Sequence, residues 1–69
     1  MVEVFKTNVT HREMADEVLS ALQIRFRYSK VNFDFEDCDK ILRIEDHQVC
    51  VKSIIELVNL SGFRCEELS

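Results

Sequence analysis

The segment that most constrains the fold runs from Val31 to Glu45, with the sequence VNFDFEDCDKILRIE. Apolar side chains occupy every second position on both sides of an acidic stretch, at Val31, Phe33, Phe35, Leu42 and Ile44. Because successive side chains of a strand point to opposite faces of a sheet, each half of the segment is typical of a strand with one apolar face. The segment therefore predicts a β-hairpin with an acidic tip.

The register of this hairpin follows from the length of its turn. A four-residue turn at 37–40 would place Phe35 opposite Leu42 and Asp34 opposite Arg43. The second pair would lie on the outer face of the sheet, together with Ile41, the one apolar exception there. We therefore expect a cross-strand ion pair worth a fraction of 1 kcal/mol.

The segments before and after the hairpin each predict a helix. Thr10 and Glu13 have the spacing of a capping box, which predicts a helix from about His11 to Ile24 or Phe26. Its buried stripe is expected at Met14, Ala15, Val18, Leu19 and Leu22, with Phe26 added if the helix reaches it. The second helix is expected from Val49 or Val51 to Ser61, with Gly62 as a left-handed C-terminal cap.

Two further strands complete the pattern, at about 2–9 and 63–68. The order is βαββαβ, which predicts a ferredoxin-like α+β domain over residues 1–69, with a four-stranded antiparallel sheet in the order 4-1-3-2 and both helices on one face. This topology brings His11, Cys38 and Phe63 to one end of the sheet. Cys50 is expected at the other end.

Composition excludes several classes of function. The formal net charge of −4 disfavours nucleic-acid binding, which needs a clustered basic surface. No apolar run approaches the ~20 residues that a membrane helix needs, so we expect a cytoplasmic protein. Three cysteines without a C-x-x-C pair indicate reduced thiols. We further expect a monomer.

The chain resembles the heavy-metal-associated domain family, small βαββαβ modules that include copper chaperones and the N-terminal repeats of metal-transporting ATPases. The resemblance covers nearly the whole chain in pattern, and Gly62-Phe63 fits the glycine-aromatic pair that family members often have after the second helix. The family carries M-x-C-x-x-C across its first strand-to-helix loop. Here Val9, His11 and Met14 stand at the three motif positions, so both motif cysteines are absent.

The resemblance implies a candidate soft-metal site with a changed donor set. His11 and Met14 would supply imidazole and thioether, and Cys38 at the hairpin tip would complete a site for Cu(I). This donor set is weaker than two thiolates. In the alternative interpretation, His11 is an exposed residue of the first helical turn and Met14 is a core residue.

A second candidate site is a surface for a protein partner. It comprises the acidic hairpin and the uncovered sheet face, with Asp34, Glu36, Asp37, Asp39 and Arg43 as its residues. Such a surface suits a basic partner protein. Calcium binding is disfavoured because no glycine permits the sharp loop of an EF-hand.

Cysteine chemistry leaves one alternative open. Cys50 would be a reactive thiolate at the N-cap of the second helix, or a semi-buried residue inside that helix, and we expect the second arrangement. Cys65 is expected in the core beside Phe63. No cysteine has a histidine base in its local sequence, and the sequence contains no serine-nucleophile motif, so we expect no enzyme activity and no catalytic residues.

Three functions are carried forward. The first is a non-enzymatic protein-interaction module without a cofactor. The second is a Cu(I)-binding or metal-chaperone-like protein that uses the non-standard site. The third is a regulatory ligand-binding or dimerising domain of the ACT type, which shares the βαββαβ order but usually has a glycine in its first loop.

Overall fold

The computed structural model describes residues 1–34 and 40–68. In this part of the chain the elements follow the predicted βαββαβ order. They are β1 (Val2–Thr7), α1 (Arg12–Arg25), β2 (Lys30–Asp34), β3 (Ile41–Glu45), α2 (Val51–Leu60) and β4 (Cys65–Leu68). Helices and strands alternate as two split β-α-β units, which confirms the predicted fold class.

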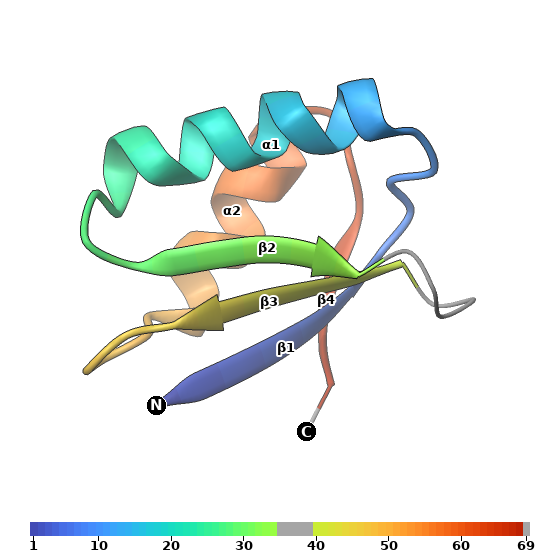
Figure 1. The fold of residues 1–69 in the computed structure, drawn as a ribbon. Helices are drawn as coiled ribbons and strands as arrows, with labels where there is room; N and C mark the ends of the chain where they lie inside the picture. The colour runs from blue at the N-terminus through green and yellow to red at the C-terminus, as the bar shows by residue number, and fades with distance from the viewer. Residues whose placement is uncertain (35–39, 69) are drawn as a thin grey trace.

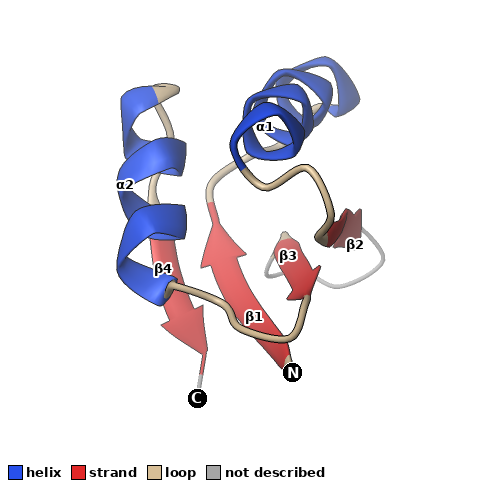
Figure 2. Ribbon diagram, turned by 90° about the vertical axis from the view of Figure 1, so that its left-hand side faces the viewer, coloured by secondary structure: helices blue, strands red, loops and turns tan. Residues whose placement is uncertain are grey.

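The strands form one antiparallel sheet in the order β2-β3-β1-β4. This is the predicted order read from the opposite edge. Both helices lie on the same face of the sheet, and α2 runs beside β4 (Figures 1 and 2). The other face is not covered by any helix that the structure describes.

The core lies between the sheet and the two helices. Among the described residues its fully or almost fully buried members are Phe5, Val9, Ala15, Val18, Leu22, Leu42, Ile44, Ile54 and Val58. The α1 members recur at steps of three and four residues, as one apolar stripe requires. Each large apolar side chain buried in this way contributes roughly 1.5–3 kcal/mol.

The hairpin pairs in a different register from the predicted one. Phe33 lies opposite Leu42, and Arg43 lies opposite Asn32. The predicted Phe35–Leu42 and Asp34–Arg43 pairings are therefore wrong. A slip of two residues keeps every side chain on its own face, so the alternating pattern cannot distinguish the two registers.

Lys40 stands directly before β3. This residue has a φ of 51°, in the left-handed region that residues other than glycine rarely adopt. Its carbonyl oxygen accepts hydrogen bonds from the Thr7 N–H at 3.2 Å and from Thr7 Oγ1 at 2.8 Å. These bonds join the end of β1 to the residue that precedes β3.

The starts of both helices also differ from expectation. The N-cap of α1 is His11, whose side chain makes no capping hydrogen bond, and the Ala15 N–H donates to the His11 carbonyl at 3.0 Å. The predicted cap at Thr10 is therefore one residue too early. The N-cap of α2 is Cys50, so our expectation that this cysteine lies inside the helix is wrong.

The end of α2 matches the prediction. Gly62 has a φ of 96°, its N–H donates to the Asn59 carbonyl at 3.0 Å, and the Phe63 N–H donates to the Val58 carbonyl at 3.2 Å. These two bonds form a Schellman motif. The motif turns the chain sharply from α2 back toward β4.

Candidate functional site

The loop from β1 to α1 carries the residues that stand at the metal-motif positions. Val9 is completely buried, Met14 is half-buried against the core, and His11 is exposed. Thr7 Oγ1 accepts a hydrogen bond from the Val9 N–H at 3.3 Å and helps to hold the loop inward. Of the three positions, only His11 presents its side chain freely to solvent.

The predicted three-residue metal site cannot be assembled from the described part of the chain. Cys38 lies outside the described residues, as do Glu36, Asp37 and Asp39 of the predicted partner surface. Within residues 1–34 and 40–68, no three or more His, Cys, Asp and Glu side chains are grouped so that they could hold a metal ion. The site of His11, Met14 and Cys38 stays a prediction.

The open sheet face carries the two described residues of the predicted partner surface, Asp34 and Arg43. An apolar patch lies beside Arg43, because Val4 is the register partner of both Arg43 and Leu68. We call the open-face patch the set Val2, Val4, Arg43, Glu45 and Leu68. Val2 is 51% exposed and Leu68 is 40% exposed, so the patch presents apolar surface to solvent.

Cys50 is the residue whose chemistry our sequence interpretation underestimated. It is exposed at the N-cap of α2, and Ser53 Oγ donates a hydrogen bond to its Sγ at 3.1 Å. This bond, helped by the backbone N–H groups of Ser53 and Lys52, lowers the pKa of the Cys50 thiol below its usual value. The signal in the sequence was the serine three residues after the cysteine.

The pKa of the Cys65 thiol is shifted in the opposite direction to that of Cys50. Cys65 is half-buried in β4 against the core, and loss of hydration raises the pKa of its thiol to about 11. At neutral pH it is protonated and unreactive. Its position confirms the expectation of a core-side cysteine.

The loop that leads to α2 is held by Asp46. Its carboxylate accepts hydrogen bonds from Ser29 Oγ and, at 2.6 Å, from the His47 N–H. These bonds lower the pKa of Asp46 below its usual value of 3.8. The Asp46 N–H also donates to the Met1 carbonyl at 3.0 Å, so this loop is tied to the start of β1.

Two glutamates meet where β1 starts and β4 ends. A hydrogen bond shared with Glu3 raises the pKa of Glu67, and the loss of hydration and the charge of Glu3 act in the same direction. This pair depends on the β1–β4 pairing, which joins segments about 60 residues apart, so no local pattern predicts it.

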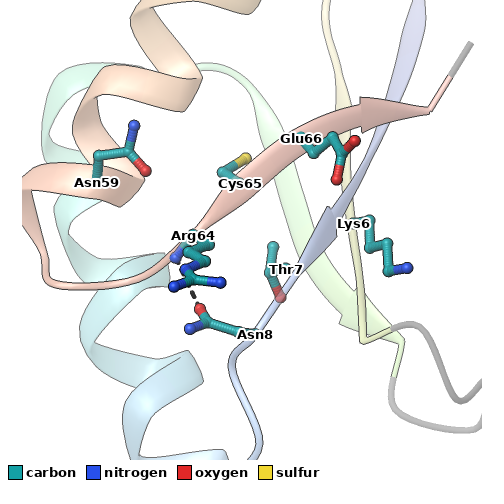
Figure 3. Close-up of a pocket in the computed structure, with 7 residues that line it drawn as sticks. All are labelled: Lys6, Thr7, Asn8, Asn59, Arg64, Cys65 and Glu66. Atoms are coloured by element: carbon teal, nitrogen blue, oxygen red, sulfur yellow. Dashed lines mark hydrogen bonds between the residues drawn. The ribbon is translucent and has the colours of Figure 1, made fainter.

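A groove of about 530 Å³ lies where β1 ends, β4 begins and α2 passes. In Figure 3 its lining residues are Lys6, Thr7, Asn8, Asn59, Arg64, Cys65 and Glu66. The Arg64 N–H donates to Asn8 Oδ1 at 2.7 Å, which joins two of the lining residues. The lining contains side chains of both signs of charge, from Lys6 and Arg64 and from Glu66.

The sheet, the two helices on one face and the strand order together define a ferredoxin-like domain. Among solved structures the chain is similar to the solution structure of the yeast copper transporter domain Ccc2a, determined in the apo and Cu(I)-loaded states. The TM-score is 0.81 at 18% identity, and the match covers 99% of this chain and 94% of the other. At this identity the likeness establishes the fold alone.

Comparisons with models of protein families and with curated proteins found no match. Across the described residues, neither helix has the length and apolar character that crossing a bilayer requires.

Proposed function

We propose that this chain is a non-enzymatic protein-interaction module that binds a basic partner protein through the open face of its sheet. The observation that carries the proposal is the one-sided architecture, since both helices cover one face and the open-face patch leaves apolar surface on the other. Exposed apolar surface bordered by charged residues is the usual composition of a docking surface.

The charges around the patch support a partner of this kind. Arg43 and Glu45 border the apolar residues on β3, and Asp34 ends β2 on the same face. The sequence continues from Asp34 into the acidic residues Glu36, Asp37 and Asp39, and the whole chain has a net charge of −4. Long-range attraction would therefore favour a basic partner and raise its association rate.

A photo-crosslinking experiment tests this proposal. Arg43 is replaced by p-benzoylphenylalanine on the open face, and exposed Glu17 of α1 is replaced in the same way as the matched control. We expect the open-face probe to capture a basic protein that the α1 probe does not capture. Val4→Asp should abolish this capture. Identical products from both probes would contradict the proposal.

The second candidate function is Cu(I) binding, favoured by the likeness to a domain that was determined with Cu(I) and by the exposure of His11 in the corresponding loop. Imidazole and thioether are neutral donors, so we expect weak binding. The exposed Cys50 would bind Cu(I) elsewhere in the molecule. The titration therefore needs a Cys50→Ser background.

In that background the reduced protein is titrated with Cu(I) against a competing chelator while amide NMR shifts are followed. Cu(I) binding at the first loop predicts shifts at 9–14 that His11→Ala removes. Binding weaker than micromolar, or shifts scattered over the sheet, would reject this function. Cys38→Ser then tests whether the hairpin cysteine supplies a third ligand.

A further inference from the structure

The outer edge of β4 has the geometry of a strand-binding site. β4 pairs with β1 on one side, and no strand of the described chain pairs with its other side. In an antiparallel sheet every second residue of an edge strand directs its N–H and C=O groups away from the sheet. These groups are available to an added strand.

The side chains of β4 determine what such a strand must carry. Glu66 and Glu67 are exposed and adjacent, so they point to opposite faces of the sheet. Glu66 lies opposite Lys6 of β1, whereas Glu67 lies opposite Phe5 and has no cation in register. An added strand therefore meets a carboxylate on each face.

Charge also decides against a second copy of this chain as the occupant. If two β4 strands paired in antiparallel fashion along their whole length, Glu66 of one copy would lie opposite Glu67 of the other. Like charges directly opposite each other destabilise a strand pair.

Side chains of α2 line hollows beside the edge of β4. Leu60 of α2 is 84% exposed, and with Glu56 and Asn59 it lines a cavity of about 410 Å³. Asn59 also lines the groove at the start of β4, so the two hollows share this residue. The edge therefore offers backbone groups, an apolar side chain and a third carboxylate.

From this arrangement we infer that the edge of β4 binds an extended segment of a partner protein as an antiparallel strand, with two consecutive basic residues opposite Glu66 and Glu67 and an apolar residue opposite Leu68. Main-chain hydrogen bonds supply the affinity, and the two carboxylates select the sequence. This surface is separate from the open-face patch except for Leu68, and its occupant is a peptide segment rather than a folded surface.

The test titrates the whole protein with the capped peptide Thr-Val-Lys-Lys-Val-Thr and follows amide NMR shifts. We expect shifts at 64–68 and 56–60, and slower hydrogen exchange in β4. The peptide Thr-Val-Glu-Glu-Val-Thr should not bind. Two further peptides, N-methylated at alternate residues, test the main-chain bonds, and at least one should bind about tenfold more weakly.

Charge reversal gives the matched comparison. Glu66→Lys with Glu67→Lys should weaken binding of the lysine peptide by about tenfold or more and permit binding of the glutamate peptide. Asp16→Lys with Glu17→Lys makes the same change in net charge on exposed positions of α1, and should leave binding of the lysine peptide within about twofold.

The proposal is overturned if the lysine peptide produces no shifts up to about 1 mM. It is also overturned if the shifts centre on the open-face patch, if both charge-reversed pairs lose affinity equally, or if both N-methylated peptides bind as well as the parent. Shifts at Arg43 and Glu45 alone would instead support docking at the open face. The two proposals therefore fail independently.

Discussion

The two halves of this fold present the same local structure with different chemistry. In each half a strand leads through a loop to a helix whose N-cap is a potential metal ligand, His11 before α1 and Cys50 before α2. The first loop is held inward by buried Val9, and its N-cap makes no side-chain bond. The second loop is tied by Asp46, and its N-cap thiol accepts a hydrogen bond from Ser53.

The difference shows that the same backbone fold can carry different potential metal ligands at its two helix starts. A helix N-terminus stabilises an anion whichever half of the fold it belongs to. In the family that this chain resembles, the thiols belong to the first loop. Here the thiolate-stabilising environment is found at the start of the second helix, at the opposite end of the sheet. Four experiments test how far this difference extends.

The largest effect is expected from restoring thiols to the first loop. His11→Cys with Met14→Cys recreates C-x-x-C before and within the first turn of α1, and two thiolates hold Cu(I) far better than imidazole and thioether. In a Cys50→Ser background we expect Cu(I) affinity to rise by several orders of magnitude in chelator competition. The matched control places the same pair at exposed Ser20 and Gln23 of α1.

An unchanged Cu(I) affinity would show that the loop backbone, and not only its side chains, has lost the ability to bind metal. The comparison must be made on folded protein, because removing the half-buried Met14 side chain costs roughly 1–3 kcal/mol. The free energy of unfolding of both double variants is therefore measured in urea first.

The second effect concerns how firmly each loop is packed. Val9→Ala removes two methyl groups from a completely buried site and should lower the free energy of unfolding by about 2 kcal/mol. Val49→Ala, in the half-buried loop before α2, is the matched variant and should cost less than about 1 kcal/mol. Equal losses in urea denaturation would mean that the two loops are packed alike.

The third effect is on thiol reactivity. Ser53→Ala removes the hydrogen bond to Cys50 Sγ, so the pKa of Cys50 should rise and its reaction with a disulfide reagent at pH 7 should slow by about threefold. Cys38→Ser is used as the background, and Cys65 contributes nothing because its pKa is about 11. Ser61→Ala, on the other end of α2, is the control and should leave the rate unchanged.

A reaction rate that is insensitive to Ser53→Ala would assign the lowered pKa to the helix backbone alone. A pH profile separates the two causes. Loss of the Ser53 bond moves the midpoint of the profile upward, whereas a change in access to the thiol lowers the whole profile without moving its midpoint.

These particular residues also show what the sequence could predict. Element order and the Gly62 cap follow from periodicity and local backbone preference, and the sheet order follows from the βαββαβ topology, so all three were predicted correctly. The predicted hairpin register was wrong because a slip of two residues preserves the alternating pattern, so the pattern fits both registers equally well. The Cys50 cap was misplaced because Val49 and Val51 both fit the start of a helical pattern.

The candidate sites were harder to predict than the fold. His11 and Arg43 were placed on the correct surfaces, because exposure follows from helix and strand periodicity. The predicted sheet order already placed the last strand at an edge, but the Glu3–Glu67 pair depends on the register between the two ends of the chain. This register is absent from any local window of sequence.

The smallest effect is expected from the side chains that hold the two loops, Asp46 and Thr7, because only the contribution of Asp46 to stability depends on pH. The pKa of Asp46 is lowered in the folded protein, so its contribution to stability is present above the usual pKa of 3.8 and is lost as the pH falls through the lower folded value. Asp46→Asn removes this contribution. We therefore expect a small decrease in the thermal midpoint at pH 7 that disappears in acid.

Thr7→Val removes the uncharged anchor of the first loop and should lower the midpoint at both pH values. Ser29→Ala should behave as Asp46→Asn does, and Ser20→Ala on exposed α1 is its control. If the effect of Asp46→Asn is the same at pH 7 and in acid, Asp46 holds the second loop by shape alone, and the electrostatic difference between the two loops is confined to Cys50.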